Sequence, residues 1–452
     1  MQKQDNSSHS FSRRTLLRAG AISALGMNLP GLLHARTVAE ANRKGGRAKS
    51  CILLFATGGA AQQETFDPKP DAGAGVAGDF QAIRTSVPGT HICEHLPMMA
   101  RQAHRYTIIR STHHGSGTHG VGVHYNMTGW KPAARAGEPQ ISREDPPCVG
   151  GAVRQLRGDR KGLPGAVHLP VRIGDQNNFQ WGGQHAGYLG PRYDPMMLID
   201  EKWKPGTLPP GFTSSAGIGR KRQQHRGALV KQLERSSRKA VGAETEWIRL
   251  REQAHSVMES STVWDAFLTE KEKPATIQRY GDNKFGRSCL VARRLIEAGV
   301  GLVTVPWMHL HSTKNFDTHS NHFKLMKDTL LPPVDRAFSA LLEDLNERGM
   351  LDETLVAWTG EFGRTPKINK NAGRDHWGNV YSTVLAGGGI RGGQVYGSSD
   401  KMGGEPKDNP VHASDFVATI YDALGYESGT MVHDVRGQPR PLMVGKPVRA
   451  LF

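Results

Sequence analysis

The sequence predicts an α/β fold in which helices cover both faces of a mostly parallel sheet. Five short apolar runs, the first ending at Gly58-Gly59, are typical of strands that are buried on both sides. Stretches with helical character lie between them, and strands that alternate with helices favour parallel pairing. The expected strands are residues 51–57, 106–112, 301–307, 354–359 and 382–386, and the expected helices are residues 95–104, 244–268, 284–298, 321–348 and 413–424. We therefore expect a three-layer, doubly wound sheet.

The size and composition fit one large soluble domain. The chain has 452 residues, of which 37% are hydrophobic and 22% charged. Its 54 glycines and 26 prolines predict many turns and long structured loops. Because we find no internal repeat and no clear linker, we expect a single domain over residues 50–452, with a loop-rich insertion at about residues 140–240.

The charge balance is basic, with a formal net charge of +16. This charge favours polyanionic partners. The densest basic stretch, residues 220–239, lacks interleaved aromatic residues and matches no nucleic-acid module, so nucleic acid is not an expected partner. A solvated helix face is the simpler interpretation of this stretch, and binding of a polyanion is the alternative.

The N-terminal residues 1–35 have the pattern of a Tat-type signal peptide. Arg13 and Arg14 precede a short apolar run. This run is too short, and too interrupted by glycine and proline, for a stable membrane span. Residues 36–49 would form a polar linker. We therefore expect the Tat export machinery as a partner and a periplasmic or extracellular location; a chance arginine pair before a buried helix is the alternative.

Histidine and carboxylate side chains follow four of the predicted strands. They lie in residues 58–70, 111–119, 309–320 and 360–378. Because doubly wound sheets bind ligands outside the carboxyl ends of their strands, we expect the four segments to meet at one rim. Carboxylate oxygens and imidazole nitrogens suit Zn²⁺, Mn²⁺ or Mg²⁺, so the pattern predicts a metal site. The alternative is a rim of hydrogen-bonded residues that only satisfies the loop backbone.

Particular residues in these segments suggest roles. Asp317 and His319 can face the same side of an extended turn, because alternate residues of an extended chain point the same way. Glu361 follows a buried strand directly, where its carboxylate can face a cleft. Arg364 is a candidate catalytic residue that could clamp an anionic oxygen, or it could pair with Glu361.

Six segments of the chain resemble motifs of the DUF1501 family. They are GGAAQQETFDPKP (58–70), HYNMTGW (124–130), FDTHSNHF (316–323), GEFGRTPKINKNAGRDHWG (360–378), LAGGGIRGGQVYG (385–397) and DFVATIYDALG (415–425). This family looks like a distant relative of the alkaline phosphatase and sulfatase superfamily. The resemblance implies an alkaline-phosphatase-like fold and hydrolysis of phosphate or sulfate esters at a divalent metal, which could be Zn²⁺, Mn²⁺, Mg²⁺ or Ca²⁺.

The resemblance also implies a set of metal ligands. One acidic ligand should follow the first strand, and the others should follow the strands at 301–307 and 354–359. The residues that take these places are Glu64 or Asp67, then Asp317, His319, Glu361, Asp375 and His376.

The nucleophile motif of sulfatases is missing from this chain. Residues 127–129 resemble the end of that motif, but no Cys or Ser followed by x-Pro-x-Arg precedes them. Counted back from residues 127–129 by the spacing of the sulfatase motif, the nucleophile position falls at His119. Because Thr118 is next to it, both residues are candidate catalytic residues. Thr118 would lie at a helix N-terminus, where backbone N–H groups favour a bound anion, or it could be an ordinary N-cap residue. Ser116 and Thr57 are the other hydroxyl candidates.

Two functions are therefore expected from the sequence. The first is an exported, metal-dependent hydrolase of phosphate or sulfate esters, whose substrate could be an anionic small molecule or polysaccharide. The second is a binding or scaffolding protein on the same fold that has lost turnover, since fold alone does not determine function.

Overall fold

A computed structural model describes residues 48–133, 140–160, 162–174, 179–200, 202–209, 212, 229, 246–307 and 315–452. The expected leader and nearly all of the linker lie outside the described residues, as do His309, His311 and all of the basic stretch except residue 229. None of the helices in the described part of the chain is long and apolar enough to cross a membrane.

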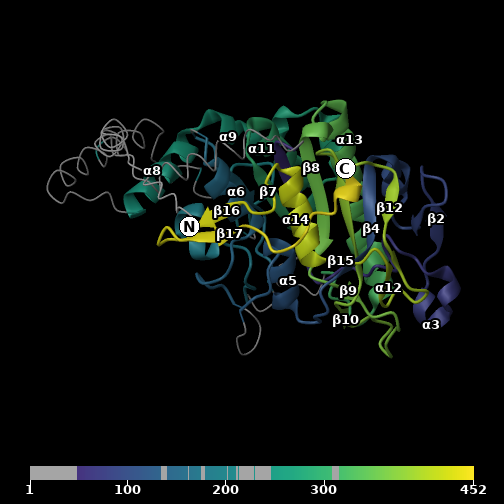
Figure 1. Ribbon diagram of the computed structural model, residues 1–452. Helices are drawn as coiled ribbons and strands as arrows, with labels where there is room; N and C mark the ends of the chain where they lie inside the picture. The colour runs from purple at the N-terminus through teal and green to yellow at the C-terminus, as the bar shows by residue number, and fades with distance from the viewer. Residues whose placement is uncertain are drawn as a thin grey trace, which may run out of the picture.

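A nine-stranded sheet forms the centre of the molecule (Figure 1). Its order is β12-β4-β11-β8-β1-β7-β5-β6, and β15 also pairs with β4. The strands are β1 (Ser50–Ala56), β4 (Tyr106–His113), β5 (Ala166–His168), β6 (Met196–Met197), β7 (Leu302–Trp307), β8 (Thr354–Gly360), β11 (Tyr381–Ala386), β12 (Gln394–Tyr396) and β15 (Val411–His412). All neighbouring pairs are parallel except those that β11 makes with β8 and β4.

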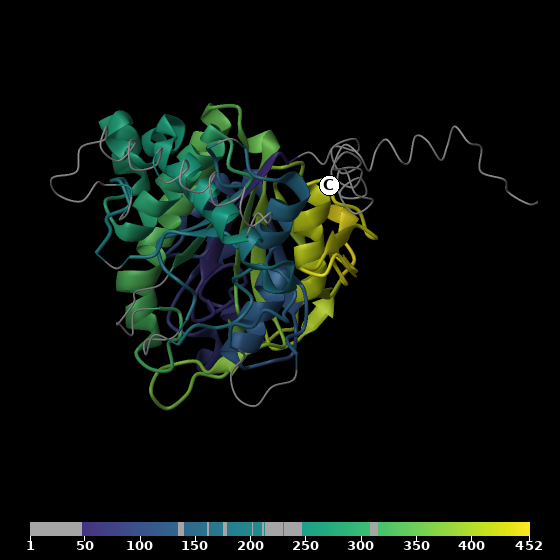
Figure 2. The ribbon, with the colours of Figure 1, turned by 90° about the vertical axis from the view of Figure 1, so that its left-hand side faces the viewer.

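Helices cover both faces of this sheet, as Figure 2 shows edge-on. One layer contains α4 (Pro97–Gln102), α9 (Ser261–Phe267), α10 (Pro274–Tyr280), α11 (Lys284–Ala298) and α13 (Leu331–Glu347). The other contains α5 (His119–Thr128), α6 (Val149–Arg157) and α14 (Ala413–Ala423). The expected three-layer, mostly parallel α/β fold is confirmed.

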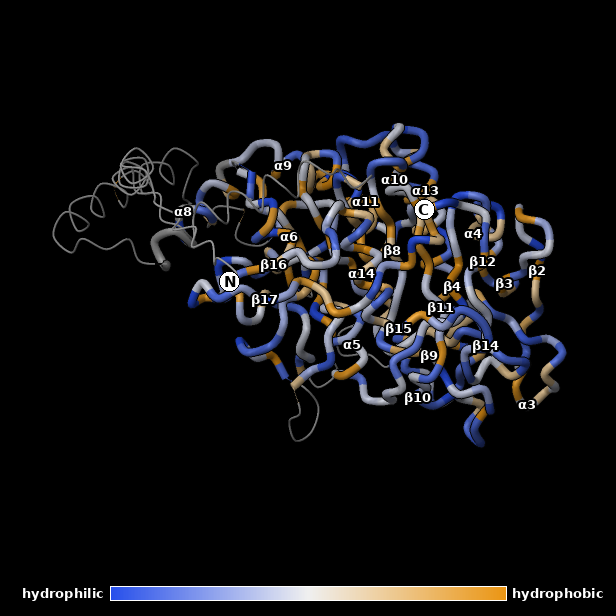
Figure 3. Tube along the Cα trace, in the orientation of Figure 1, coloured by the Kyte–Doolittle hydropathy of each residue, from blue (hydrophilic) through white to orange (hydrophobic). Residues whose placement is uncertain are grey.

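The central strand β1 shows why the sequence forms two cores. Ile52 and Leu54 belong to the core under the first layer, whereas Leu53 and Phe55 belong to the core under the second. Since alternate residues of a strand point to opposite faces, a continuous apolar run is needed to bury both. The tube in Figure 3 is accordingly orange along the inner strands and mostly blue in the outer loops.

The remaining elements are short or peripheral. They are α3 (Ala74–Ala77), α8 (Glu246–Glu259), α12 (His322–Leu325), β2 (Ala82–Arg84), β3 (His91–Cys93), β9 (Gly363–Arg364), β10 (His376–Trp377), β13 (Ser398–Ser399), β14 (Pro406–Asp408), β16 (Met431–His433) and β17 (Pro439–Pro441). The four cysteines are buried and form no disulfide.

Two expected helices are divided. The helix expected over 244–268 breaks at Ser260, whose side chain accepts a hydrogen bond from Val263 N and so starts α9 as a new helix. The helix expected over 321–348 contains a π-helical turn, Met326–Leu330, just before α13. Pro332 and Pro333 follow this turn, and because they lack backbone N–H groups they cannot complete the α-helical hydrogen bonds behind them.

The region at 140–240 adds to the sheet as well as to the loops. Its described residues include α6 and the edge strands β5 and β6. These strands have three and two residues, which is too short for periodicity to predict.

Candidate metal centre

Four loops meet beyond the carboxyl ends of β1, β4, β7 and β8. Because these strands run in the same direction, their C-terminal residues lie along one edge of the sheet. The loops bring together residues that are far apart in the sequence, since His376 Nδ1 lies 2.8 Å from the carbonyl oxygen of Gly117, 259 positions away. This edge is the rim that the sequence predicts.

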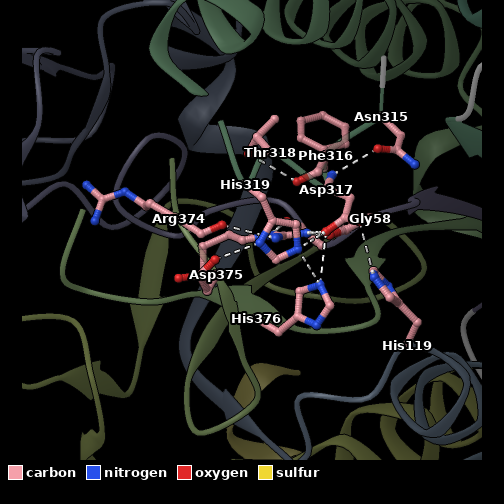
Figure 4. A network of polar contacts seen from close by, with 12 residues as sticks. Gly58, His119, Asn315, Phe316, Asp317, Thr318, His319, Arg374, Asp375 and His376 are labelled. Carbon is pink, nitrogen blue, oxygen red and sulfur yellow. Dashed lines mark hydrogen bonds and ion pairs between the residues drawn. The ribbon is translucent and has the colours of Figure 1, made fainter. Parts of the chain in front are cut away.

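Asp317 lies at the centre of a group of imidazoles at this rim (Figure 4). Its Oδ1 is 3.0 Å from the Nε2 atoms of both His319 and His376, and its Oδ2 is 3.5 Å from His119 Nε2. The ligand atoms of His119, Asp317 and His376 lie within 4.8 Å of one another, as a shared metal ion requires. His319 adds a further nitrogen, because its Nε2 is 2.9 Å from that of His376.

Each of the three imidazoles is held in the same way. Nδ1–H of His119 donates to Glu361 Oε1 at 2.9 Å, that of His376 to the Gly117 carbonyl, and that of His319 to Asp375 Oδ1 at 2.6 Å. With Nδ1 held by an acceptor, each imidazole turns its Nε2 toward Asp317. The Nε2 lone pairs and the Asp317 carboxylate could together hold one divalent cation.

The charges at the rim are strongly coupled. Burial alone would raise the pKa of Asp317, but hydrogen bonds from His119 and His376 and the charge of Arg364 hold it well below its ordinary value. Burial alone would lower the pKa of His119, but hydrogen bonds and charge from Asp317 and Glu361 outweigh this effect and raise it to about 9. Asp317 is therefore an ionised acceptor throughout the physiological range.

The indole of Trp181 supports the ring of His119. The two rings stack with centroids 4.7 Å apart and an interplanar angle of 5°. Phe362 lies against the same imidazole at 4.9 Å. Trp181 is buried and comes from the insertion at 140–240, so this segment contributes a wall of the site.

We expect Trp181→Leu to weaken metal binding about two- to tenfold, because a lost aromatic stack releases the His119 ring from its orientation. The metal dissociation constant measures this effect. Trp203→Leu, at another buried tryptophan that packs on Phe267, is the matched control and should leave the constant unchanged. Equal affinities in all three proteins would contradict a role for the stack.

Gly58 allows the first strand's loop to approach the segment that carries Asp317. It has a φ of +99°, and a Cβ built there would lie 2.3 Å from Asp317 N. Its own N–H donates to Glu361 Oε1 at 2.6 Å. A side chain at this position would therefore displace the backbone of a proposed ligand.

We expect Gly58→Ala to lower stability by about 1–3 kcal/mol and to reduce metal affinity at least about tenfold, because the strained backbone and the clash move Asp317. Gly429→Ala is the control, since Gly429 has a φ of +102° with no atom within 4 Å of the added Cβ. The Gly429→Ala protein should lose stability without losing metal affinity. Thermal unfolding measures the stability, and metal titration measures the affinity. A Gly58→Ala protein with native affinity would contradict the close approach.

A family model described as "Protein of unknown function (DUF1501)" matches residues 48–452. The chain belongs to this family. The matched range includes every residue proposed for the site. No match was found among curated proteins.

Solved structures of other proteins resemble this DUF1501 chain. A sulfatase from Pseudoalteromonas sp. shares 12% identity over 88% of this chain and 72% of its own, with a TM-score of 0.38. A phosphonate monoester hydrolase from Silicibacter pomeroyi shares 12% identity over 89% and 76%, also with a TM-score of 0.38. An alkaline phosphatase superfamily protein from Vibrio parahaemolyticus shares 9% identity over 85% and 78%, with a TM-score of 0.33. None of these likenesses bears on the activity of this chain.

The structure brings four of the predicted ligand residues of this DUF1501 protein close to Asp317 or its histidines. His319 and His376 contact Asp317 directly. Glu361 and Asp375 instead contact the Nδ1 atoms of His119 and His319, which face away from Asp317. Glu361 Oε2 is fully buried and has no hydrogen-bond partner among the described residues. His119, which the sequence suggests as a catalytic residue, lies in the same group as the ligands.

Glu64 and Asp67 lie outside this group. Both oxygens of Glu64 are used, one by Arg374 at 2.5 Å and the other by His322 at 3.0 Å. Asp67 pairs with Lys69 at 2.9 Å and accepts a hydrogen bond from the Ser399 hydroxyl. The sequence shows an acidic residue after the first strand, but it cannot show these distant partners.

Arg364 pairs with Asp317, at 2.6 Å, rather than with Glu361. Its other hydrogen bonds go to the carbonyl oxygens of Gly58, Gly59 and Arg374. Four of its five N–H groups are thus used, and the side chain is fully buried. This geometry fits a residue that orients Asp317 better than one that clamps a substrate.

Thr118 takes the N-cap position of α5, but its side chain makes no cap hydrogen bond. The N-cap position expected for Thr118 is confirmed, but its hydroxyl does not cap the helix. The Ser116 hydroxyl accepts from Thr118 N at 3.2 Å, and the Thr57 hydroxyl is fully buried. Of the three hydroxyl candidates, Thr118 is next to His119 and is not used as a cap.

Proposed function

We propose that this protein is an exported, metal-dependent hydrolase of phosphate or sulfate esters. The supporting observation is that His119, His319 and His376 all hold Nδ1 on an acceptor and turn Nε2 toward Asp317. This arrangement is how proteins fix imidazoles as metal ligands. Export is proposed from the twin-arginine pattern of the leader.

The donor set favours a particular class of metal. Three imidazole nitrogens and one carboxylate suit Zn²⁺ or a similar transition metal, whereas Mg²⁺ and Ca²⁺ prefer all-oxygen sites. His119, Asp317 and His376 would hold the metal and leave a coordination position for water or substrate, with His319 beside them. When bound, such a metal polarises an ester oxygen and lowers the pKa of a bound water.

The protein's own groups would orient the ligands and gather the substrate. Glu361 and Asp375 fix the rings of His119 and His319, and Arg364 fixes Asp317. Lys367 and Lys370 are exposed on the loop that leads to Asp375, and with the basic charge of the chain they would attract an anionic substrate such as a sulfated or phosphorylated polysaccharide. The Thr118 hydroxyl is the candidate nucleophile.

The test is an ester screen on the full-length mature protein with an arylphosphate, an arylsulfate and a sulfated oligosaccharide, before and after removal of metal by a chelator. We expect turnover that the chelator abolishes and added Zn²⁺ restores. Thr118→Val distinguishes the Thr118 hydroxyl from a bound water as the nucleophile, because the substitution should stop turnover only if the hydroxyl attacks. Turnover that persists without metal would contradict the proposal.

The burial of Arg364 favours the second candidate, a metal-binding protein without turnover. Its guanidinium is committed to Asp317 and to backbone carbonyls, so it offers no free anion clamp. A metal-loaded protein that binds an anionic ester but hydrolyses none of the panel would support this candidate. Metal-dependent hydrolysis that Asp317→Asn abolishes would remove it.

A further inference from the structure

A buried polar network lies behind the candidate metal centre. It consists of Glu64, Arg374 and His322, each 0% exposed, and Thr318, which is 1% exposed. Charged groups are rarely buried to this extent unless each of them is paired.

Glu64 is the hub of this network. Its Oε1 accepts from Arg374 Nη2 at 2.5 Å, and its Oε2 is 3.0 Å from His322 Nε2. The other nitrogen of His322, Nδ1, is 2.6 Å from the Thr318 hydroxyl. Burial alone would raise the pKa of Glu64, but the charges and hydrogen bonds of His322 and Arg374 hold it below its ordinary value. Glu64 is therefore an ionised carboxylate with both oxygens occupied.

The two ends of the network are adjacent to the proposed ligands. Thr318 lies between Asp317 and His319, and Arg374 immediately precedes Asp375 and His376. The two segments also meet directly, because Arg374 N donates to the Thr318 carbonyl oxygen at 3.1 Å. The sequence separates them by more than 50 residues, so this contact has to be held by tertiary interactions.

Arg374 extends the same restraint to the rest of its loop. Its guanidinium donates to the carbonyl oxygens of Val76, Thr365 and Pro366 as well as to Glu64. Loss of the Glu64 charge would leave this buried cation without its counterion and would free the loop that carries His376.

The carboxylate, imidazole and hydroxyl of Glu64, His322 and Thr318 also have the order found in nucleophilic triads. The Thr318 hydroxyl is only 1% exposed, however, and it is hydrogen-bonded to His322 and to the Phe316 carbonyl. A substrate cannot reach it, so the network is suited to holding backbone rather than to attack.

We propose that Glu64 is a positioning residue: through Arg374, His322 and Thr318 it fixes the spacing of the two ligand-bearing segments, and it controls metal affinity without touching the metal. This inference rests on the proposed function, because it assumes that Asp317 and His376 bind metal. It replaces the role of direct ligand that the sequence suggests for Glu64.

The test is a titration of the folded, metal-free protein with Co²⁺, followed by the visible absorption of the bound ion. In Glu64→Gln we expect the dissociation constant to rise about 10- to 100-fold, the usual effect of removing a group that orients metal ligands. The absorption spectrum of the bound Co²⁺ should stay unchanged, because the ligands are the same. Thr318→Val, which removes only one hydroxyl, should raise the constant about fivefold and decides the question if Glu64→Gln does not fold.

Asp344→Asn is the matched control. Asp344 is also a buried carboxylate, paired with the buried Arg293 at 2.8 Å, but it lies on α13 outside the site. It should lose stability with no change in Co²⁺ affinity. Equal Co²⁺ affinities in wild type, Glu64→Gln and Thr318→Val would overturn this inference and leave the proposed function standing. A changed absorption spectrum in Glu64→Gln would also overturn it, because Glu64 would then be a ligand. A folded wild type that does not bind Co²⁺ would overturn the proposed function as well.

Discussion

Asp317→Asn is expected to reduce metal affinity at least about 100-fold and ester turnover about 1,000-fold. Asp317 is the one carboxylate that all three imidazole Nε2 atoms face. The amide keeps an oxygen for Arg364 but removes the charge that holds a cation. Since a catalytic metal contributes several kcal/mol of transition-state stabilisation, its loss accounts for a drop of this size.

The measurements for Asp317→Asn are metal content after dialysis and initial rates on the best ester of the panel. Its control is Asp434→Asn. Asp434 also accepts hydrogen bonds from an arginine and from two backbone N–H groups, but it lies near β16 and β17, outside the site. This variant should keep its metal. Full metal content in a folded Asp317→Asn protein would show that Asp317 is an ordinary ion-pair residue.

His376→Ala is expected to lower metal affinity at least about 100-fold, with little loss of stability. Its side chain is 25% exposed and makes one hydrogen bond outside the group, to the Gly117 carbonyl. Removal therefore deletes a proposed ligand without opening a buried cavity. His319→Ala should have a smaller effect, about tenfold, because its ring is 44% exposed and lies outside the group of His119, Asp317 and His376.

This order of effects can be read from isothermal titration with Zn²⁺. His433→Ala, on β16, is the control and should bind Zn²⁺ as wild type does. A His319→Ala protein that loses more affinity than His376→Ala would mean that the metal sits nearer Asp375 than this geometry implies.

Much of the fold follows from the sequence because burial on two faces demands a distinctive pattern. The run at β1 is apolar at every position from Cys51 to Ala56, as a short strand covered on both sides requires. The antiparallel direction of β11 follows from the connection that precedes it. No helix lies between β8 and β11, so the chain cannot make the crossover that a parallel pair needs.

The site was less predictable, since sequence shows which loops meet but not which way each side chain turns. Glu361 and Asp375 are carboxylates at the expected strand end, and nothing in their sequence shows that they contact imidazole Nδ1 atoms instead of lying in the closest ligand set. Trp181 could not be found, because a glycine-rich insertion gives no periodicity to place it. Glu64 and Arg374 are 310 residues apart, and only the folded chain makes them a pair.

The most direct test of the proposed metal centre is the metal content of the wild-type protein, measured by plasma mass spectrometry after purification without added metal or a histidine tag. The geometry of the three imidazoles predicts close to one transition-metal ion per chain, lost in both Asp317→Asn and His376→Ala. A well-folded wild-type protein that holds no metal and takes up none on addition of Zn²⁺ would contradict the proposed site and the hydrolase built on it.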